Sequence, residues 1–174
     1  MTPEEFDKLD ALPDVLHGYR FDILRPTGRI GHYGAADVTT PSPMEPGDEP
    51  ARWTPAARCL LGRRHAAPDW LCTCGWNVMC NLAEVAGYAP RYVTDIPARA
   101  VVVEATAHGP MFPGAAADDT ETTVRATWLR LGDRIWIRKG VSRAVVSATR
   151  RYYPFARVER FHSLAELVAV PVGA

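Results

Sequence analysis

The chain has 174 residues, 47% of them hydrophobic and 23% charged, so it is long enough for one domain with a sizeable core and is not a disordered tail. Its 20 basic and 20 acidic side chains cancel, which excludes a net charge that would steer the whole molecule to nucleic acid or to an anionic membrane. We expect a single domain over residues 1–174, with a metal-stapled half at 1–90 and a β-rich half with C-terminal helices at 91–174.

The N-terminal region predicts a helix, a strand and a loop in that order. "TPEEFDKLDAL" (2–12) has helix-start signals, "GYRFDILRP" (18–26) alternates like a strand, and "PSPMEPGDEP" (41–50) is a proline-rich exposed loop. The chain begins without a basic segment followed by an apolar one, and it contains no apolar run of about 18 residues. We therefore expect a cytoplasmic protein that does not bind membranes.

A cluster of cysteines follows the loop and is the clearest chemical signal in the chain. Cys59, His65, Cys72 and Cys74 have the spacing C-x5-H-x6-C-x-C. In a reducing compartment such a cluster indicates metal binding or reactivity rather than disulfides. Three thiolates and one imidazole are a usual closed shell for structural Zn²⁺, and Gly75 would permit the turn that brings two cysteines to one ion.

Other interpretations of the cluster remain open at this level. Two cysteines separated by one residue point to opposite faces of an extended chain, so Cys59 could be a buried small side chain and His65 a surface residue. Cys80 falls on a helix predicted over "WNVMCNLAEVAGY" (76–88) and ending at Gly87, where a core position is favoured over a ligand. An iron–sulfur cluster with one histidine is a further alternative to zinc.

The second half of the chain predicts strands and then helices. "ARAVVVEATA" (98–107), "TETTVRATWLRL" (120–131) and "DRIWIRK" (133–139) are rich in β-branched and aromatic residues, with a loop after the first and a tight "LGDR" turn between the other two. "SRAVVSATRRYY" predicts a helix that stops at Pro154, and "HSLAELVA" predicts another with Ser163 and Glu166 as a capping box. These strands should form an antiparallel sheet or a partly open barrel.

An ordered set of motifs resembles a known family over about residues 17–126. The set is "HGYRFDI", W-x-P at Trp53 to Pro55, "AARC" ending in Cys59, "HAAPDWLCTCGW", "PARAVVVEATAHG" and "VRA" at 124–126. It is similar to uncharacterised proteins widespread in actinobacteria and their phages. The resemblance implies that Cys59, His65, Cys72 and Cys74 belong to one unit, and it implies no activity.

An enzyme is the less favoured interpretation of the same cluster. A catalytic zinc needs an open coordination position and a nearby base, whereas four strong ligands close the shell, and the nearest acids are Asp69 and Glu84. A thiol enzyme would use Cys72 or Cys74 with His65 or His108 as base. The chain contains none of the familiar zinc-hydrolase, deaminase, phosphate-loop or serine-hydrolase motifs.

A basic stretch near the C-terminus is a weaker candidate site for nucleic acid. Residues 134–174 hold 8 basic and 2 acidic side chains, against 4 and 10 in residues 1–50. Arginines interleaved with aromatic residues suit phosphates and stacked bases. The alternative is that helix-terminal arginines meet the helix dipole, that the aromatic residues are core, and that the acidic N-terminal segment covers the patch. The candidate residues are Arg138, Lys139, Arg143, Arg150 and Arg151.

Together these patterns predict an α+β protein whose irregular N-terminal half is stapled by structural Zn²⁺ and packed on the sheet. We expect a non-enzymatic binding or adaptor protein with an unknown protein or nucleic-acid partner. The alternatives are a nucleic-acid-binding protein that uses the 134–160 segment, and a zinc- or thiol-dependent enzyme.

Overall fold

The computed structural model describes residues 12–31, 57, 65–69, 74–92, 99–114 and 122–169. The helix expected at 2–12, apart from Leu12, and the loop expected at 41–50 lie outside these ranges. The described part of the chain has an α+β fold, which confirms the predicted class. Its elements are β1 (Val15–Leu24), β2 (Ile30–Gly31), β3 (Trp76–Met79), α2 (Leu82–Tyr92), β4 (Ala100–Pro113), β5 (Thr123–Arg138), α3 (Arg143–Tyr152), β6 (Arg157–Phe161) and α4 (Leu164–Val168).

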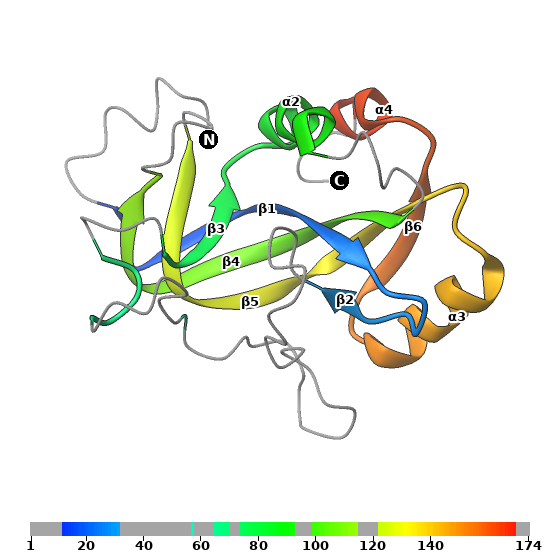
Figure 1. The fold of residues 1–174 in the computed structure, drawn as a ribbon, viewed down its shortest axis with the longest axis horizontal. Coiled ribbons are helices and arrows are strands. Elements are labelled where there is room, and N and C mark those ends of the chain that lie inside the picture. Colours follow the sequence, from blue (N-terminus) through cyan, green and yellow to red (C-terminus); the bar gives the residue numbers. More distant parts are fainter. Residues whose placement is uncertain are drawn as a thin grey trace.

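A long antiparallel hairpin of β4 and β5 forms the centre of the sheet (Figure 1). β1 pairs antiparallel with the other edge of β4, and β3 pairs antiparallel with β5. A single residue pair, Tyr19 with Met79, also joins β3 to β1, so these four strands are linked in a ring. β2 extends β1, and β6 pairs with β5 in parallel, so the sheet is mainly antiparallel and is not a regular barrel.

The expected "LGDR" turn is wrong, because these residues lie inside β5. Val103 pairs with Ile135 and Ala105 with Leu131, so β5 advances four residues where β4 advances two. The additional residues form a bulge, which bends a strand without ending it. Gly132 is required there, since a Cβ at this position would lie 2.5 Å from the Cβ of Glu104.

The helix expected over residues 76–88 is also wrong in its first part and at its end. Trp76–Met79 form β3, where Trp76 and Val78 are buried and pair with residues of β5. The helix starts only at Leu82, where the Asn81 side chain accepts a hydrogen bond from the Glu84 amide at 2.9 Å, and it continues past Gly87. Pairing with β5 thus outweighs the helix-like spacing of the apolar residues in this segment.

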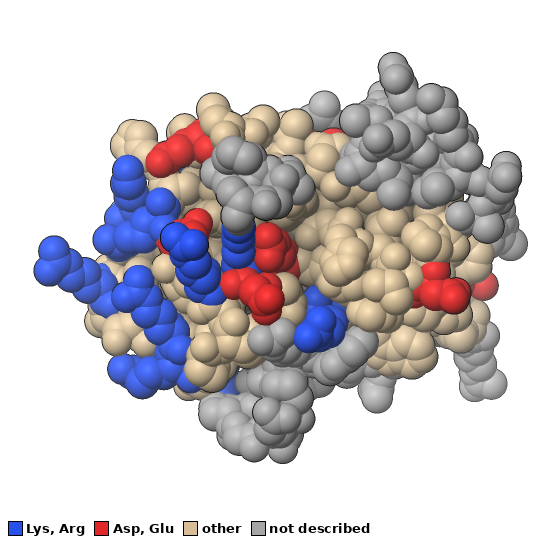
Figure 2. All heavy atoms as spheres, turned by 180° about the vertical axis from the view of Figure 1, so that it is seen from behind, with Lys and Arg blue, Asp and Glu red and all other residues tan. Residues whose placement is uncertain are grey.

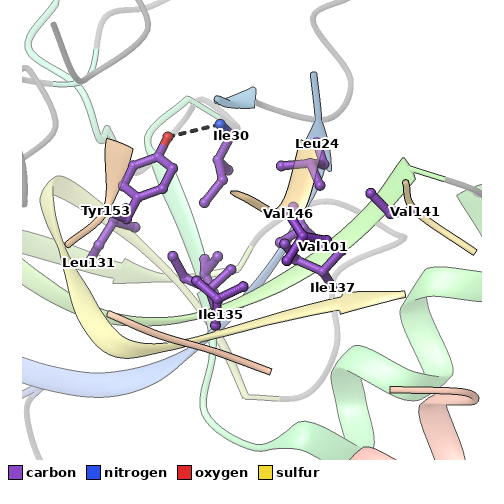
Figure 3. Close-up of a cluster of buried hydrophobic side chains, with 11 residues drawn as sticks. Leu24, Ile30, Val101, Leu131, Ile135, Ile137, Val141, Val146 and Tyr153 are labelled. Atoms are coloured by element: carbon purple, nitrogen blue, oxygen red, sulfur yellow. Dashed lines mark hydrogen bonds between the residues drawn. The ribbon is translucent and has the colours of Figure 1, made fainter. Parts of the chain in front are cut away.

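Side chains cover both faces of the sheet. On one face, α3 contributes Val146 to a cluster with Val101, Ile135 and other apolar residues. Tyr153, just after α3, adds its ring to the same cluster, and its hydroxyl accepts a hydrogen bond from the Ile30 amide (Figure 3). On the other face, α2 and α4 lie side by side (Figure 1), and their leucines pack on the Trp136 side of the sheet. A strand covered on both faces is apolar without alternation, as Val101–Val103 is.

The two predicted C-terminal helices are present. α3 has Ser142 as its N-cap and ends before Pro154. In α4 the Ser163 side chain accepts a hydrogen bond from the Glu166 amide, which confirms the predicted cap. The Glu166 carboxylate accepts from the His162 amide at 2.7 Å, and this hydrogen bond lowers the pKa of Glu166. No helix in the described ranges is long and apolar enough to cross a membrane.

Candidate functional site

The structure brings together two of the four predicted metal ligands. The Sγ atom of Cys74 lies 3.9 Å from Nε2 and 4.0 Å from Nδ1 of His65. Both residues are partly buried. Cys59 and Cys72 lie outside the described residues. Within the described ranges no group of three or more His, Cys, Asp or Glu side chains is arranged as a metal site.

The imidazole of His65 is oriented by its own loop. Its Nδ1 lies 2.7 Å from the carbonyl oxygen of Ala66 and 4.0 Å from Oδ2 of Asp69. A carbonyl only accepts, so this contact places the proton on Nδ1. The lone pair of Nε2 is then available to an ion, and an orienting carbonyl on the other nitrogen is the usual arrangement around a metal-binding histidine.

Arg125 on β5 holds the two segments that carry His65 and Cys74. This arginine is 1% exposed. Its Nη1 donates to the carbonyl of Asp69 at 3.1 Å and to that of Cys74 at 3.5 Å, while Nε and Nη2 both donate to Pro113 at 3.1 Å. One guanidinium, with its rigid set of donors, therefore joins the loop that contains Asp69, the residue Cys74 just before β3, and the end of β4.

Gly75 makes the close contact between these segments possible. Its φ of +125° lies in the region that glycine alone adopts readily, as the sequence predicted for a turn after Cys74. A Cβ at this position would lie 3.0 Å from the Cβ of Arg125 and 3.1 Å from that of Pro68. Pro68 itself follows a cis peptide bond and is buried. The loop therefore packs directly on β5.

The chain just before Cys59 reaches the same part of β5. The amide of Ala57 donates to the carbonyl of Thr127 at 2.8 Å. Thr127 lies two residues after Arg125 on the strand. The segment leading to Cys59 and the two segments carrying His65 and Cys74 thus contact neighbouring positions of β5.

A second buried arginine supports the cluster from β1. Arg20 forms a two-point ion pair with Asp22, at 2.9 and 3.1 Å, and its Nη1 donates to the carbonyl of Asn77 on β3 at 2.5 Å. Its guanidinium also lies 5.5 Å from the ring centre of Trp76. The arginines of "HGYRFDI" and "VRA" therefore both fix the surroundings of β3, a role that the sequence analysis did not assign to them.

Cys80 and Glu84 have structural positions. Cys80 is 4% exposed in a cluster with Trp76 and Val78, and burial raises the pKa of its thiol to about 11. This confirms the core position favoured from the sequence. Glu84 is on α2, and both oxygens of its carboxylate accept from the amide of Thr122, at 3.2 and 3.3 Å. These hydrogen bonds connect α2 to the residue just before β5, so Glu84 has a structural role.

The residues of the basic stretch lie on the surface, whereas its aromatic residues mostly do not. Lys139, Arg143, Arg150 and Arg151 are exposed and Arg138 is partly exposed. Trp136 and Tyr153 are 2% and 1% exposed, and Phe155 packs against the core. The expected pairing of arginines with aromatic rings for base stacking is therefore absent at these positions, because the rings stabilise the core.

The candidate residues chosen from the sequence do not include every cation at this end of the molecule, although Arg157 and Arg160 lie within the basic 134–160 segment. Arg157 and Arg160 on β6 are exposed, and so is Arg25 in the turn between β1 and β2. Arg29 in that turn stacks over Tyr152 at the end of α3, with 5.1 Å to the ring centre. Figure 2 shows Lys and Arg side chains gathered at this end. Local sequence gives no signal for this grouping, because the segments meet only through tertiary contacts.

Comparison with protein-family models, with curated proteins and with solved structures finds no significant match to this chain. The resemblance to actinobacterial and phage proteins stays a prediction from the motifs. The functional argument therefore depends on the geometry of the two candidate sites.

Proposed function

We propose that this chain is a zinc-stabilised, non-enzymatic binding protein, in which Cys59, His65, Cys72 and Cys74 hold one structural Zn²⁺. The observation that carries the proposal is the approach of the Cys74 thiol to the His65 imidazole. In a tetrahedral site with ordinary zinc–sulfur and zinc–nitrogen bonds, the two ligand atoms would be about 3.6 Å apart. The observed separation of 3.9 Å between Sγ and Nε2 is close to that value.

Covalent connectivity supports adding the two remaining ligands. Cys59 follows Ala57 by two residues, and Cys72 precedes Cys74 by two. A two-residue span limits each Cα pair to about 7 Å. Because Ala57 and Cys74 both contact β5 within residues 125–127, these spans are short enough for the proposed ligands Cys59 and Cys72 to reach the same region.

A structural role for the metal follows from the donor set. Three thiolates and one imidazole fill a tetrahedron and leave no position for a substrate or an activated water. The ion would supply folding energy to a loop region that is otherwise held by hydrogen bonds from Arg125. A partner would then bind to surface residues and not to the metal ion.

The test is metal analysis by mass spectrometry on protein purified without a metal-affinity tag. We expect about one zinc per chain in the wild type and a loss of that zinc in Cys59→Ser, Cys72→Ser and Cys74→Ser. Cys80→Ala is the matched control, since Cys80 lies in the core and should leave the zinc content unchanged. A folded wild-type protein without metal would refute the proposal, and iron with sulfide in place of zinc would replace it by the iron–sulfur alternative.

One observation favours a second candidate, a thiol enzyme. The same contact between Cys74 and His65 has the composition of a nucleophile and its base. Alkylation of the native protein with iodoacetamide distinguishes the two. Coordinated thiolates react only after a chelator is added, whereas an activated Cys74 reacts quickly in the native state and more slowly in His65→Ala.

A further inference from the structure

We propose that the end of the molecule built around α3 binds double-stranded nucleic acid through the phosphate backbone, without reading its sequence. This surface, called the basic end below, consists of exposed side chains from three separate parts of the chain. They are Arg25, Lys139, Arg143, Arg150, Arg151, Arg157 and Arg160. The inference rests on the proposed role as a binding protein and names its partner.

The stripe of cations along α3 follows from helical periodicity. Arg143, Ser147, Arg150 and Arg151 are spaced by four, three and one residues, so they lie on one face of the helix, and all four are exposed. The opposite face carries Val146 and Thr149, which are buried. Arg143 and Arg150 are separated by about 10 Å along the helix axis, a span over which two guanidinium groups reach different phosphates.

Tertiary packing adds cations on both sides of this stripe. On β6, the side chains of Arg157 and Arg160 are exposed, and α3 is joined to β6 by the hydrogen bond from Arg150 to the Val158 carbonyl at 3.3 Å. On the other side, the β1–β2 turn packs against α3, because the site of a Cβ at Gly28 lies 2.6 Å from the Cβ of Ala148. The result is a group of basic side chains gathered at one end of the molecule (Figure 2).

Among the described residues, the carboxylates near this surface do not balance its charge. Residues 134–160 hold eight basic side chains and one acidic one, Glu159. Glu159 pairs with Arg157 at 2.6 Å and also accepts a hydrogen bond from Trp136 at 3.0 Å. Glu166 on α4 accepts from the His162 amide. The remaining arginines carry a net positive charge that a polyanion would neutralise.

The chemistry of this surface favours a duplex over a single strand or a membrane. Stacking of single-stranded bases needs exposed rings, but Trp136 and Tyr153 are buried, and the ring of Tyr152, which is partly buried, already has the Arg29 guanidinium over it. Insertion into a membrane needs exposed apolar residues, but the large exposed ones among the described residues are Val15, Trp128 and Val168, none of them on α3 or β6. Arginine outnumbers lysine six to one at the basic end, and one guanidinium can donate two parallel hydrogen bonds to the oxygens of a phosphate group.

The test is fluorescence anisotropy of the full chain with a labelled 20-base-pair DNA duplex of arbitrary sequence, from 50 to 200 mM salt. If three to five phosphates are contacted, the slope of log affinity against log salt should be about −3 to −5. The charge-reversed double variant Arg143→Glu with Arg151→Glu should lower the affinity at 50 mM salt by at least about tenfold and make the slope shallower by roughly 2.

Arg130→Glu is the matched control for a single reversal at Arg151. It lies on β5 opposite Thr106, whereas Ile137 lies opposite Val101, so Arg130 is roughly 20 Å along the strand from Arg138 and beyond the screening length in these buffers. We expect Arg151→Glu to weaken duplex binding several-fold more than Arg130→Glu. Circular dichroism on each variant establishes that it is folded.

Three results would overturn the inference: no duplex binding at 50 mM salt, equal effects of Arg130→Glu and Arg151→Glu, or preferential binding to the single strand. Binding to vesicles with anionic lipid but not to DNA would replace the partner with a membrane and also overturn it. Metal content measured on the same preparation separates the two proposals. Zinc without DNA binding refutes only the proposal of duplex binding. DNA binding without zinc refutes only the proposal of a structural zinc site.

Discussion

At the β3 end of the molecule the arginines point inward, whereas at the α3 end they point outward. Arg20 and Arg125 are 5% and 1% exposed, and their donors hold carbonyl groups and a carboxylate around β3. Arg143 and Arg151 are exposed on a helix whose other face packs on the apolar core. One residue type therefore organises a loop region at one end and a charged surface at the other.

The two ends are stabilised by different interactions: apolar burial at the α3 end, and hydrogen bonds from buried arginines at the β3 end. Around α3, valines, isoleucines and Tyr153 bury a large apolar area, so the arginines are not needed for folding. In the described part of the loop containing His65 and Cys74, hydrogen bonds from a buried guanidinium order the backbone. The four predictions below test this contrast, from the largest expected effect to the smallest.

Arg125→Met should be the most damaging single change at either end. It leaves the carbonyls of Asp69, Cys74 and Pro113 without their common donor in a buried position. We expect a loss of about 3 to 5 kcal/mol in the free energy of unfolding, measured by urea denaturation. Arg130→Met, on the same strand but partly exposed, is the control, and equal losses in the two variants would contradict the role assigned to Arg125.

Asp22→Asn should cost roughly 3 kcal/mol, because it leaves the buried guanidinium of Arg20 without its charged partner. The double variant Arg20→Met with Asp22→Leu removes both charges and should recover part of that loss. A double-mutant cycle from urea denaturation gives the coupling energy of the pair. A coupling energy near zero would show that the pair does not act as a unit.

Tyr153→Phe should lower the stability by about 1 to 2 kcal/mol, since the Ile30 amide loses its acceptor, the Tyr153 hydroxyl, at 2.9 Å (Figure 3). Burial raises the pKa of Tyr153 from 10.0 to about 12. The unfolded chain therefore ionises first, so the stability given by the protonated hydroxyl is present below pH 10 and is lost as the pH rises through 12. Above pH 10 the wild type should lose stability faster than Tyr153→Phe, as thermal unfolding at several pH values would reveal.

Arg143→Gln at the α3 end should change the free energy of unfolding by less than about 0.5 kcal/mol, because its side chain is exposed and the core lies on the opposite face of α3. Urea denaturation beside Arg125→Met gives the direct comparison between an outward and an inward arginine. A loss of 2 kcal/mol or more would mean that Arg143 is part of the folding framework.

Local patterns predicted much of the secondary structure. The alternation in "GYRFDIL", the β-branched run at residues 100–103 and the caps at Ser142 and Ser163 all correspond to observed elements. They could be predicted because alternation and capping act between residues that are neighbours in the chain. The strand at Trp76–Met79 and the continuous β5 could not, since partners distant in sequence decided them.

For the candidate sites too, some features could be predicted from the sequence and others depend on packing. The spacing of Cys59, His65, Cys72 and Cys74 suggested a metal site, which stays a prediction, and among the described residues the structure shows only that His65 lies beside Cys74. The cations of α3 and β6 were evident in the basic 134–160 segment, whereas Arg25 lies beside them only through packing. No pattern marked Arg125 as the residue that holds the loop, because the three carbonyls it binds come from segments far apart in the chain.

The sequence by itself determined the α+β class, the ends of the two C-terminal helices and the residue types available for a metal and for phosphates, because propensity, capping and ligand chemistry act locally. Tertiary structure alone decided which arginines are buried and which are exposed. It also decided that Trp136 and Tyr153 of the basic stretch belong to the core. The physical reason is that burial depends on what packs against a side chain, and at β3 and α3 the packing partners come from distant parts of the chain.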